Sequence, residues 1–442
     1  MLPVRATTLL TSQLASVSAF LLGALTLLLP SGYAYGAAVF IVFAMASFPL
    51  WAKERLSDRS AVWLALVFAV MGAVWIFGAD LDRGLSALNK PFRYVLALAC
   101  IPVAFLYPPK GRWLLWGIAV GAAFGGLRAS YDIFVLGYER AWYDAAHQSS
   151  SGVIQYGNMS GLFGLICWVQ WAVFHERWSW RRSALMLACV FLGVLGSLLS
   201  QTRGGWVALV LCMVPLLWLI YRYVANHRFI YAVLGLLAVV MALLWHQSSY
   251  LQERWSLARD EVAGFVKNGE ADNSVGHRLA HWKLAWDMGL EKPLTGWGEA
   301  GYAEQKRLRV EKGEAPPSVL YYGHAHNEWF DMFVKRGVIG LVGLLLFYAV
   351  PLALFWPTQA RVRLPDGEID RDALCLRLVG VLFPLSYLGF GLTQVFLAHY
   401  NGLMVYMFMV TLTLAALKGL PCTSTRYPVS VQKNQPSASS QH

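Results

Sequence analysis

The sequence predicts an all-α protein that crosses a membrane many times. Three observations carry this prediction. Hydrophobic residues make up 57% of the 442 residues and charged residues only 14%, a balance far from that of soluble proteins. Apolar stretches long enough to span a bilayer, about 20 residues each, follow one another along most of the chain. A single long polar segment, from about Gln247 to Glu328, interrupts them.

The apolar stretches number about twelve and define the predicted membrane helices. They begin near Leu14, Tyr33, Ala61, Tyr94, Trp113, Val153, Ala184, Trp206, Phe229, Val338, Leu376 and Asn401. The first one follows Arg5, as in a signal peptide, but a second apolar stretch comes directly after it. We therefore expect the first stretch to be retained as a helix.

Four regions follow from this pattern. Residues 1–246 carry predicted membrane helices one to nine, and residues 247–328 form the polar loop between helices nine and ten. Residues 329–420 carry helices ten to twelve. Residues 421–442 are rich in Ser, Thr, Pro and Gln, which predicts a disordered tail.

Lys and Arg in the short loops predict the orientation of the chain, because cytoplasmic loops carry more of them. The basic loops alternate, and their residues are Lys53, Arg55, Arg59, Lys110, Arg112, Arg177, Arg181, Arg182, Arg222, Arg228, Arg361, Arg363 and Arg371. The loop after the third helix is an exception on the other side, with Arg83, Lys90 and Arg93. The pattern predicts an inner-membrane protein with cytoplasmic termini and a periplasmic polar loop.

The net charge of +11 needs no nucleic acid to explain it. Much of it belongs to the basic loops, and the remainder in the polar loop could serve an anionic lipid substrate. The chain has six cysteines, and none lies in the polar loop. A disulfide framework is therefore not expected there, even in an oxidising compartment.

The sequence of the polar loop predicts three helices within it. Apolar residues recur with helical spacing from Trp255 to Val266 and again from Leu279 to Leu290. Ser274 is the expected N-cap of the second of these helices. A third helix is expected from Glu299 to Glu314, after which Pro316-Pro317 predict an extended segment.

His326 is the first candidate for chemistry, because it lies where the polar loop meets the next apolar span. A histidine with an ordinary pKa of about 6.5 can be neutral and accept a proton near neutral pH. Asn327 and Glu328 flank it and either could fix its tautomer, while His324 is a second candidate base. The alternative is an interfacial histidine that tolerates both water and membrane.

Two arginines are candidates for binding an anion. Arg203 lies in Ser200–Trp206, a short turn between apolar helices whose glycines would let a phosphate approach the backbone. Snorkelling of the side chain to lipid phosphates is the alternative explanation. Arg278 lies one helical turn before Trp282, whose ring could brace the guanidinium.

A bound metal ion is not expected. One pair of histidines in the polar loop has the spacing of a zinc-binding pair, but no obvious third ligand accompanies it. Asp80 and Asp82 lie in an outer loop, where Arg83 and Lys90 follow them closely. We therefore expect Asp80 and Asp82 to be surface residues that form ion pairs with these cations rather than metal ligands. Lys and Arg can neutralise a diphosphate without metal, so Arg83 and Lys90 join the candidate substrate-binding residues.

These segments, in this order and separation, resemble the O-antigen ligase and polymerase superfamily of bacterial envelope glycosyltransferases. The segments are Ser200–Trp206, Arg278–Trp282 with Pro293–Gly298, and His324–Asn327 with Gly337–Leu341. The resemblance covers about Leu198 to Leu345, and the first half of the chain supports it through topology. A layout of about twelve helices, with the large loop between helices nine and ten, resembles the ligase branch and implies a GT-C-like fold.

The resemblance implies transfer of O-antigen polysaccharide from undecaprenyl diphosphate to a sugar hydroxyl of lipid A–core, with inversion and without a metal or another cofactor. It implies that His326 is the catalytic base and that Arg203 and Arg278 bind the donor diphosphate. The further candidate substrate-binding residues are Trp282, Arg83, Lys90, Asn327 and Glu328.

Three alternatives stay open. An O-antigen polymerase and a protein O-oligosaccharyltransferase share the donor and differ in the acceptor. A lipid-linked sugar transporter would instead show polar residues in mid-helix and related halves of the chain. The conspicuous charges here cluster at outer helix ends and in one loop. The oligomeric state, the sugars and the choice between His324 and His326 as the base also stay open.

Overall fold

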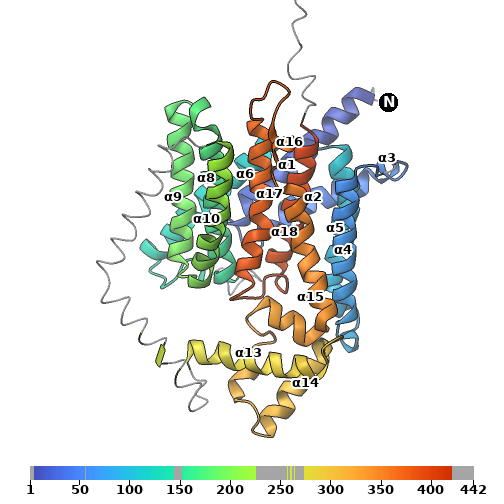
Figure 1. The fold of residues 1–442 in the computed structure, drawn as a ribbon, viewed down its shortest axis with the longest axis vertical. Coiled ribbons are helices and arrows are strands. Elements are labelled where there is room, and N and C mark those ends of the chain that lie inside the picture. The colour runs from blue at the N-terminus through green and yellow to red at the C-terminus, as the bar shows by residue number, and fades with distance from the viewer. Residues whose placement is uncertain are drawn as a thin grey trace, which may run out of the picture.

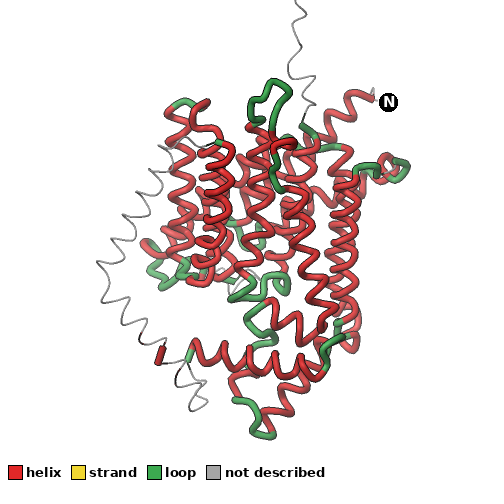
Figure 2. Tube along the Cα trace, viewed as in Figure 1, coloured by secondary structure: helices red, strands yellow, loops and turns green. Residues whose placement is uncertain are grey.

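The computed structural model describes residues 4–54, 56–143, 152–224 and 273–420, together with Ser256, Arg259, Asp260 and Ala263. In this part of the chain every regular element is a helix, drawn in red in Figure 2, and one isolated β-bridge pairs Arg363 with Ile369. The predicted all-α class is therefore confirmed for the described residues.

The helices before the polar loop form both sides of the bundle in Figure 1, drawn in green at the left and in blue at the right, and part of its centre. They are α1 (Val4–Thr26), α2 (Tyr33–Ala46), α3 (Phe48–Trp51), α4 (Arg59–Phe77), η1 (Leu81–Leu88), α5 (Asn89–Leu106), α6 (Gly111–Phe134), α8 (Val153–Phe174), η2 (His175–Arg177), α9 (Trp180–Leu199) and α10 (Arg203–Tyr223). The polar loop and the helices after it form α13 (Ser274–Glu291), α14 (Gly298–Glu311), η3 (Pro317–Leu320), α15 (Glu328–Phe355), α16 (Gln359–Val362), α17 (Arg371–Phe390) and α18 (Tyr400–Lys418).

Six of the described helices are long and apolar enough to cross a membrane by length and composition: α4, α9, α10, α15, α17 and α18. The predicted spans near Leu14, Tyr33, Tyr94, Trp113 and Val153 also fall on helices, namely α1, α2, α5, α6 and α8. The predicted ninth span, from Phe229, lies outside the described residues. The chain is thus a multi-pass membrane protein, and the count of about twelve spans stays a prediction.

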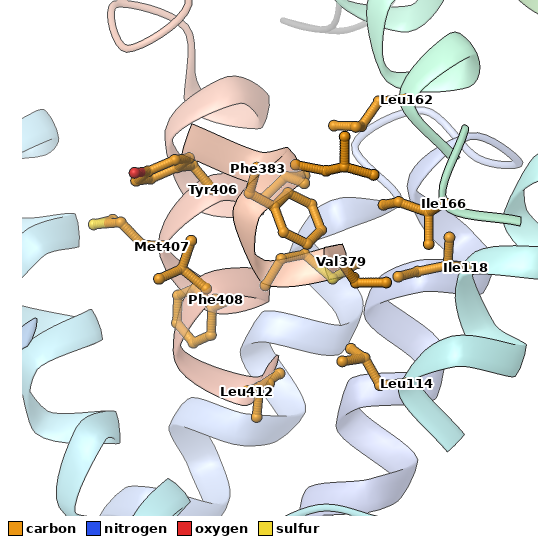
Figure 3. Packing of buried hydrophobic residues seen from close by; sticks show 14 of the residues in the cluster. Leu114, Ile118, Leu162, Ile166, Val379, Phe383, Tyr406, Met407, Phe408 and Leu412 are labelled. Carbon is orange, nitrogen blue, oxygen red and sulfur yellow. The ribbon is translucent and has the colours of Figure 1, made fainter. Parts of the chain in front are cut away.

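Helices α17 and α18 occupy the centre of the bundle. Of their apolar windows 83% and 94% are buried, whereas α9 and α10 bury 28% and 33%. Figure 3 shows Phe383 of α17 and Phe408 of α18 in one cluster with Ile118 and Ile166. The hydroxyl of Tyr406 donates to the Phe347 carbonyl at 2.9 Å, which also ties α18 to α15. The outer helices are left with apolar faces that suit lipid.

The polar loop forms a layer of its own at one end of the bundle. Helix α13 crosses that end in Figure 1, and α14 lies beyond it. The two helices begin close to the predicted residues, which confirms both. The N-cap of α13 is Asn273 rather than Ser274, because the Asn273 Oδ1 accepts from the Gly276 N–H at 2.7 Å. The predicted helix over Trp255–Val266 and the tail 421–442 lie outside the described residues, apart from Ser256, Arg259, Asp260 and Ala263.

The segment after α14 is only partly extended. Pro316 has an extended backbone, as predicted, but η3 follows directly from Pro317. The chain then enters α15, whose helical geometry is broken at Gly337 with a φ of 61°. The long part after the break begins at Val338, the residue predicted to open this span. The short part before it, Glu328–Arg336, belongs to the layer of the polar loop.

Candidate functional site

Residues 322–327, here called the histidine loop, connect η3 to α15. Asn327 caps α15, because its Oδ1 accepts from the N–H groups of Trp329 at 2.9 Å and Phe330 at 3.1 Å. Its Nδ2 donates to the Leu392 carbonyl at 3.0 Å. The next residue, Glu328, donates its N–H to the Gly391 carbonyl at 2.7 Å. These bonds attach the histidine loop to residues 391–399, here called the α17–α18 loop.

The Glu328 side chain strengthens this attachment. It is buried, and its Oε2 accepts from the N–H groups of Phe396 at 2.6 Å and Leu397 at 3.0 Å. Through these two hydrogen bonds the Glu328 carboxylate fixes the backbone of the irregular α17–α18 loop. Asn327 and Glu328 therefore hold two loops together, and neither bonds to the His326 ring in the described structure.

Buried charges hold the histidine loop from its other side. Lys306 of α14 donates to the Tyr322 carbonyl at 2.6 Å, and Lys335 of α15 donates to the Gly323 carbonyl at 3.0 Å. The Asp331 Oδ1 accepts from the Ala325 N–H at 2.9 Å. Three backbone groups of a six-residue segment are thus fixed by charged side chains, which form stronger hydrogen bonds than neutral ones.

The same charges belong to a larger network. Lys335 Nζ lies 3.0 Å from both Glu299 Oε2 and Asp331 Oδ2, and Arg336 Nη2 lies 3.1 Å from Glu299 Oε1. Arg336 also lies 4.0 Å from the centre of the Trp75 ring and donates to the Val74 carbonyl. Burial alone would raise the pKa of Glu299, but Lys335 and Arg336 hold it well below its usual range. The network joins α14, α15 and α4.

Sequence analysis did not identify Lys335, Arg336, Glu299 or Asp331 as part of the site. A local signal was present, since Asp331 and Lys335 are four residues apart on one helix face and directly precede an apolar span. Charges at that position need partners, which the histidine loop and α14 supply.

Four histidines gather at the histidine loop. The His326 ring centre lies 4.4 Å from those of Tyr322 and His324 and 5.6 Å from that of His281, and His324 lies 5.8 Å from His399. Burial is the main cause that lowers the pKa of each, to about 4 for His326, about 2 for His324, about 3 for His281 and about 4 for His399. All four rings are therefore neutral at physiological pH.

His326 has a fixed orientation. Its backbone lies in the left-handed region with a φ of 53°, and its N–H donates to His324 Nδ1 at 3.3 Å. Its side chain hydrogen-bonds to Gln394 of the α17–α18 loop. An amide oxygen that accepts one ring N–H leaves the other ring nitrogen of a neutral imidazole free to accept a proton. Gln394, rather than Asn327 or Glu328, is thus the residue that orients the ring.

Arg278 lies close to His326. It is half-buried on α13, and its positive charge lowers the pKa of His326, after burial as the larger cause. Burial also lowers the pKa of Arg278 itself. The predicted bracing by Trp282 is not seen: the Trp282 ring packs on Phe330 at 5.8 Å, and no cation–π contact in the described part of the chain joins it to Arg278.

The turn that carries Arg203 lies next to the α17–α18 loop. It is the exposed first residue of α10. The next residue, Gly204, packs so closely on Thr393 that an added Cβ would lie 2.2 Å from the Thr393 Oγ1. Thr393 precedes Gln394, the hydrogen-bond partner of His326. The turn that carries Arg203 therefore abuts the loop that orients the candidate base.

A second arginine supports this turn. Arg140 donates from Nε and Nη2 to the Ser200 carbonyl, at 3.0 and 2.8 Å. Burial and then the charge of Arg203 lower the pKa of Arg140. Two guanidinium groups close enough to repel each other form a region that favours an anion. Sequence analysis did not identify Arg140, because no motif marks it.

The remaining cations differ in position. Lys90 of α5 lies 4.8 Å from the centre of the Trp75 ring and interacts electrostatically with His399 and Glu328. Arg83 is 73% exposed and forms an ion pair with Asp80 at 2.9 Å. The predicted ion pairing of this surface acid is confirmed. In the described residues, no contact joins Arg83 to the histidine loop.

The described residues include no group of three or more His, Cys, Asp or Glu side chains placed to hold a metal ion. Independence of the reaction from metal stays a prediction.

Comparison with known proteins gives two matches. Residues 187–345 match the family model described as O-Antigen ligase. The matched segment runs from α9 into α15 and contains Arg203, Arg278 and His326. The chain is also 24% identical to an uncharacterized protein of Haemophilus influenzae over 385 residues, which cover 86% of this chain and 92% of the relative.

Proposed function

We propose that this protein is an O-antigen ligase of the bacterial inner membrane, a proposal supported by the match of residues 187–345 to the family model described as O-Antigen ligase. It transfers O-antigen polysaccharide from undecaprenyl diphosphate to a sugar hydroxyl of lipid A–core. The active site faces the periplasm, and both termini lie in the cytoplasm.

One observation carries the proposal. A neutral histidine, Arg278 beside it and the turn that carries Arg203 come from three distant segments and lie around the histidine loop and the α17–α18 loop. Arg278 lies close enough to His326 to lower its pKa, and the turn of Arg203 packs beside Gln394. A lipid diphosphate needs fixed cations at a membrane surface, and a sugar hydroxyl needs a base.

The chemistry is a direct displacement at the anomeric carbon of the donor. His326 accepts the proton of the acceptor hydroxyl as its oxygen attacks that carbon. The bond from the carbon to the diphosphate oxygen breaks, and the electron pair leaves with undecaprenyl diphosphate. Arg203 and Arg278 neutralise the negative charge that develops on this leaving group, so no general acid is required. One displacement inverts the anomeric configuration.

The position of these groups relative to the membrane also supports the proposal. The histidine loop and α13 lie at one end of the bundle, next to the ends of apolar helices (Figure 1). Both substrates are lipids whose reacting groups lie at the membrane surface. Buried ionisable residues are costly there, which indicates a function for them.

A deletion strain tests the proposal through the intermediates that accumulate. Without a ligase, finished polymer remains on undecaprenyl diphosphate at the outer face of the inner membrane, and lipid A–core stays bare. A lipid A–core band that carries one repeat unit would instead identify a polymerase. Lipid-linked units confined to the cytoplasmic leaflet would identify a transporter. Normal lipopolysaccharide with loss of protein glycosylation would identify a protein O-oligosaccharyltransferase.

A further inference from the structure

The end of the bundle opposite the histidine loop contains a cavity that the proposed reaction does not use. Its volume is about 860 Å³, and it lies between the start of α6, the end of α8 and the facing ends of α17 and α18. Helix α15 leads from the histidine loop towards α16, so the start of α17 lies at this far end (Figure 1). This is the end predicted to face the cytoplasm.

Cations outnumber carboxylates in the lining of this cavity. Lys110, Arg112, Arg177 and Arg182 line it, against one carboxylate, Asp372. Arg177 forms a long ion pair, 3.8 Å, with Glu368, and both of these side chains are more than half exposed. No ion pair among the described residues involves Lys110, Arg112 or Arg182. Among the described residues, the cavity lining therefore carries net positive charge, with four cations against one carboxylate.

Two features of the structure near these cations favour the binding of an anion. The Arg182 guanidinium lies 4.3 Å from the centre of the Trp178 ring and 5.6 Å from that of Trp116, so it makes cation–π contacts with two aromatic side chains. Helix α6 begins at this cavity without a side-chain cap at Lys110. The N-terminus of a helix that spans 24 residues adds partial positive charge and open N–H groups.

The tendency of cytoplasmic loops to be basic explains part of this charge but not its arrangement. Lys53 and Arg59 lie on the same predicted face, and neither lines the cavity. At the cavity, by contrast, cations from three segments line one half-open volume together with Trp116 and Trp178. Basic cavities between membrane helices on the cytoplasmic side are typical sites for anionic lipid headgroups.

We propose that this cavity binds the phosphate headgroup of an anionic phospholipid. Four cations in two groups, Lys110 with Arg112 and Arg177 with Arg182, match a headgroup with two phosphates, as in cardiolipin, better than one with a single phosphate. Trp116 and Trp178 contact the apolar part of the lipid next to the headgroup. The bound lipid ties the ends of α6, α8, α17 and α18 together, so it stabilises the folded bundle.

Thermal unfolding of the full-length protein in detergent tests the proposal, with native mass spectrometry as a second measurement of retained lipid. The additives are cardiolipin, phosphatidylglycerol, phosphatidylcholine and inorganic diphosphate. We expect cardiolipin to raise the Tm of the wild type most and phosphatidylcholine to leave it unchanged. The double variant Arg112→Ala/Arg182→Ala should bind cardiolipin on the order of tenfold more weakly, or worse, and lose most of the rise.

The matched control is Lys53→Ala/Arg59→Ala, which removes the same charge from the same predicted face outside the cavity. It should keep the wild-type response to cardiolipin. Lys110→Gln, at an exposed residue, serves as a milder second variant and should weaken lipid retention in part. An equal cardiolipin response in wild type and in both cavity variants would overturn the proposal. A rise in Tm with diphosphate that matches the rise with cardiolipin would assign the cavity to a soluble anion instead.

Discussion

His326 combines a neutral ring with a fixed direction, and both properties come from its neighbours. Burial and the charge of Arg278 lower its pKa to about 4, so the ring is unprotonated at the pH of the cell. The side-chain hydrogen bond with Gln394 raises the pKa in the opposite direction and orients the ring.

Replacement of His326 by alanine should reduce transfer by about 10²–10⁴-fold, the usual contribution of a general base. His324→Ala should be milder, because His324 accepts from the His326 backbone N–H and so supports its conformation rather than the chemistry. Transfer of lipid-linked polysaccharide to lipid A–core by purified protein measures both effects. An inactive His324→Ala beside an active His326→Ala would reverse the assignment.

Arg203→Lys and Arg278→Lys should each lose much of the activity, because lysine keeps the charge but cannot form the bidentate bonds of a guanidinium. The loss should appear mainly as weaker or slower use of the undecaprenyl diphosphate donor. Kinetics at varied donor concentration, with Arg307→Lys on the exposed face of α14 as the control, separate this effect from a general change of charge. Wild-type kinetics in both variants would exclude them from the diphosphate site.

The pH dependence of transfer in Gln394 variants tests whether Gln394 orients the His326 ring. Its hydrogen bond raises the pKa of His326, so removal of the bond in Gln394→Ala should lower that pKa further. Transfer requires the neutral ring, so activity is lost as pH falls through the pKa of His326, about 4 in the wild type. In Gln394→Ala the rate should drop at all pH values while its acid limb moves to lower pH. In Gln394→Glu the limb should move to higher pH, because a carboxylate favours the imidazolium. An acid limb at the same pH in all three proteins would contradict this role.

At the scale of elements, the break in α15 decides where the histidine loop lies. Gly337 has a φ of 61°, and Val338 beyond it donates to the Pro293 carbonyl at 2.7 Å. Trp297 donates to the Val334 carbonyl at 2.8 Å on the other side of the break. The segment after α13 therefore runs against the broken helix. This contact carries Glu299 to Lys335 and Arg336, and so completes the ionic network.

Gly337→Ala should destabilise the protein markedly. An alanine there would adopt a backbone conformation that costs about 1–3 kcal/mol, and its Cβ would lie 2.3 Å from the Leu294 carbonyl oxygen. The matched control is Gly313→Ala: Gly313 also has a positive φ, 75°, but an added Cβ meets nothing within 4 Å. Thermal unfolding in detergent should show a larger loss for Gly337→Ala than for the control. Equal losses would mean that the packing against Leu294 is unimportant.

At the scale of the whole molecule, positive charge reaches the site from separate parts of the chain. Arg203 comes from α10, Arg278 from α13 and Lys90 from α5, while Arg140 supports the turn of Arg203. Each cation is placed by a different helix, so the field at the site depends on the assembled bundle. The proposed reaction uses this field in place of a divalent ion.

Purified protein should consequently stay active in excess EDTA, because fixed cations can neutralise the leaving diphosphate. Asp80→Asn and Asp82→Asn should be tolerated for the same reason. Asp80 is already paired with Arg83 at the surface. Transfer assays with and without EDTA measure this. Activity that disappears with EDTA and returns with magnesium or manganese would show that a metal ion takes part.

The sequence by itself determined the features that depend on neighbouring residues. Long apolar runs predict helices, because each run must satisfy its own backbone hydrogen bonds in lipid. The two described helices of the polar loop and the span from Val338 follow from local composition in the same way. His326 and Arg203 could be identified as candidates because each lies in a short motif at one end of an apolar run, and Arg278 because it lies one helical turn before Trp282 in the polar loop.

Only the tertiary structure decided how these residues are held and which neighbours they meet. Asn327 bonds to Leu392 across 65 residues, and Arg336 bonds to Val74 across 262. Gln394, Lys335 and Arg140 carry no motif, and each acquires its role only through a partner far away along the chain. Hydropathy and spacing report on one helix at a time, whereas the candidate base and the cations around it are placed by contacts between helices, which depend on how the whole bundle packs.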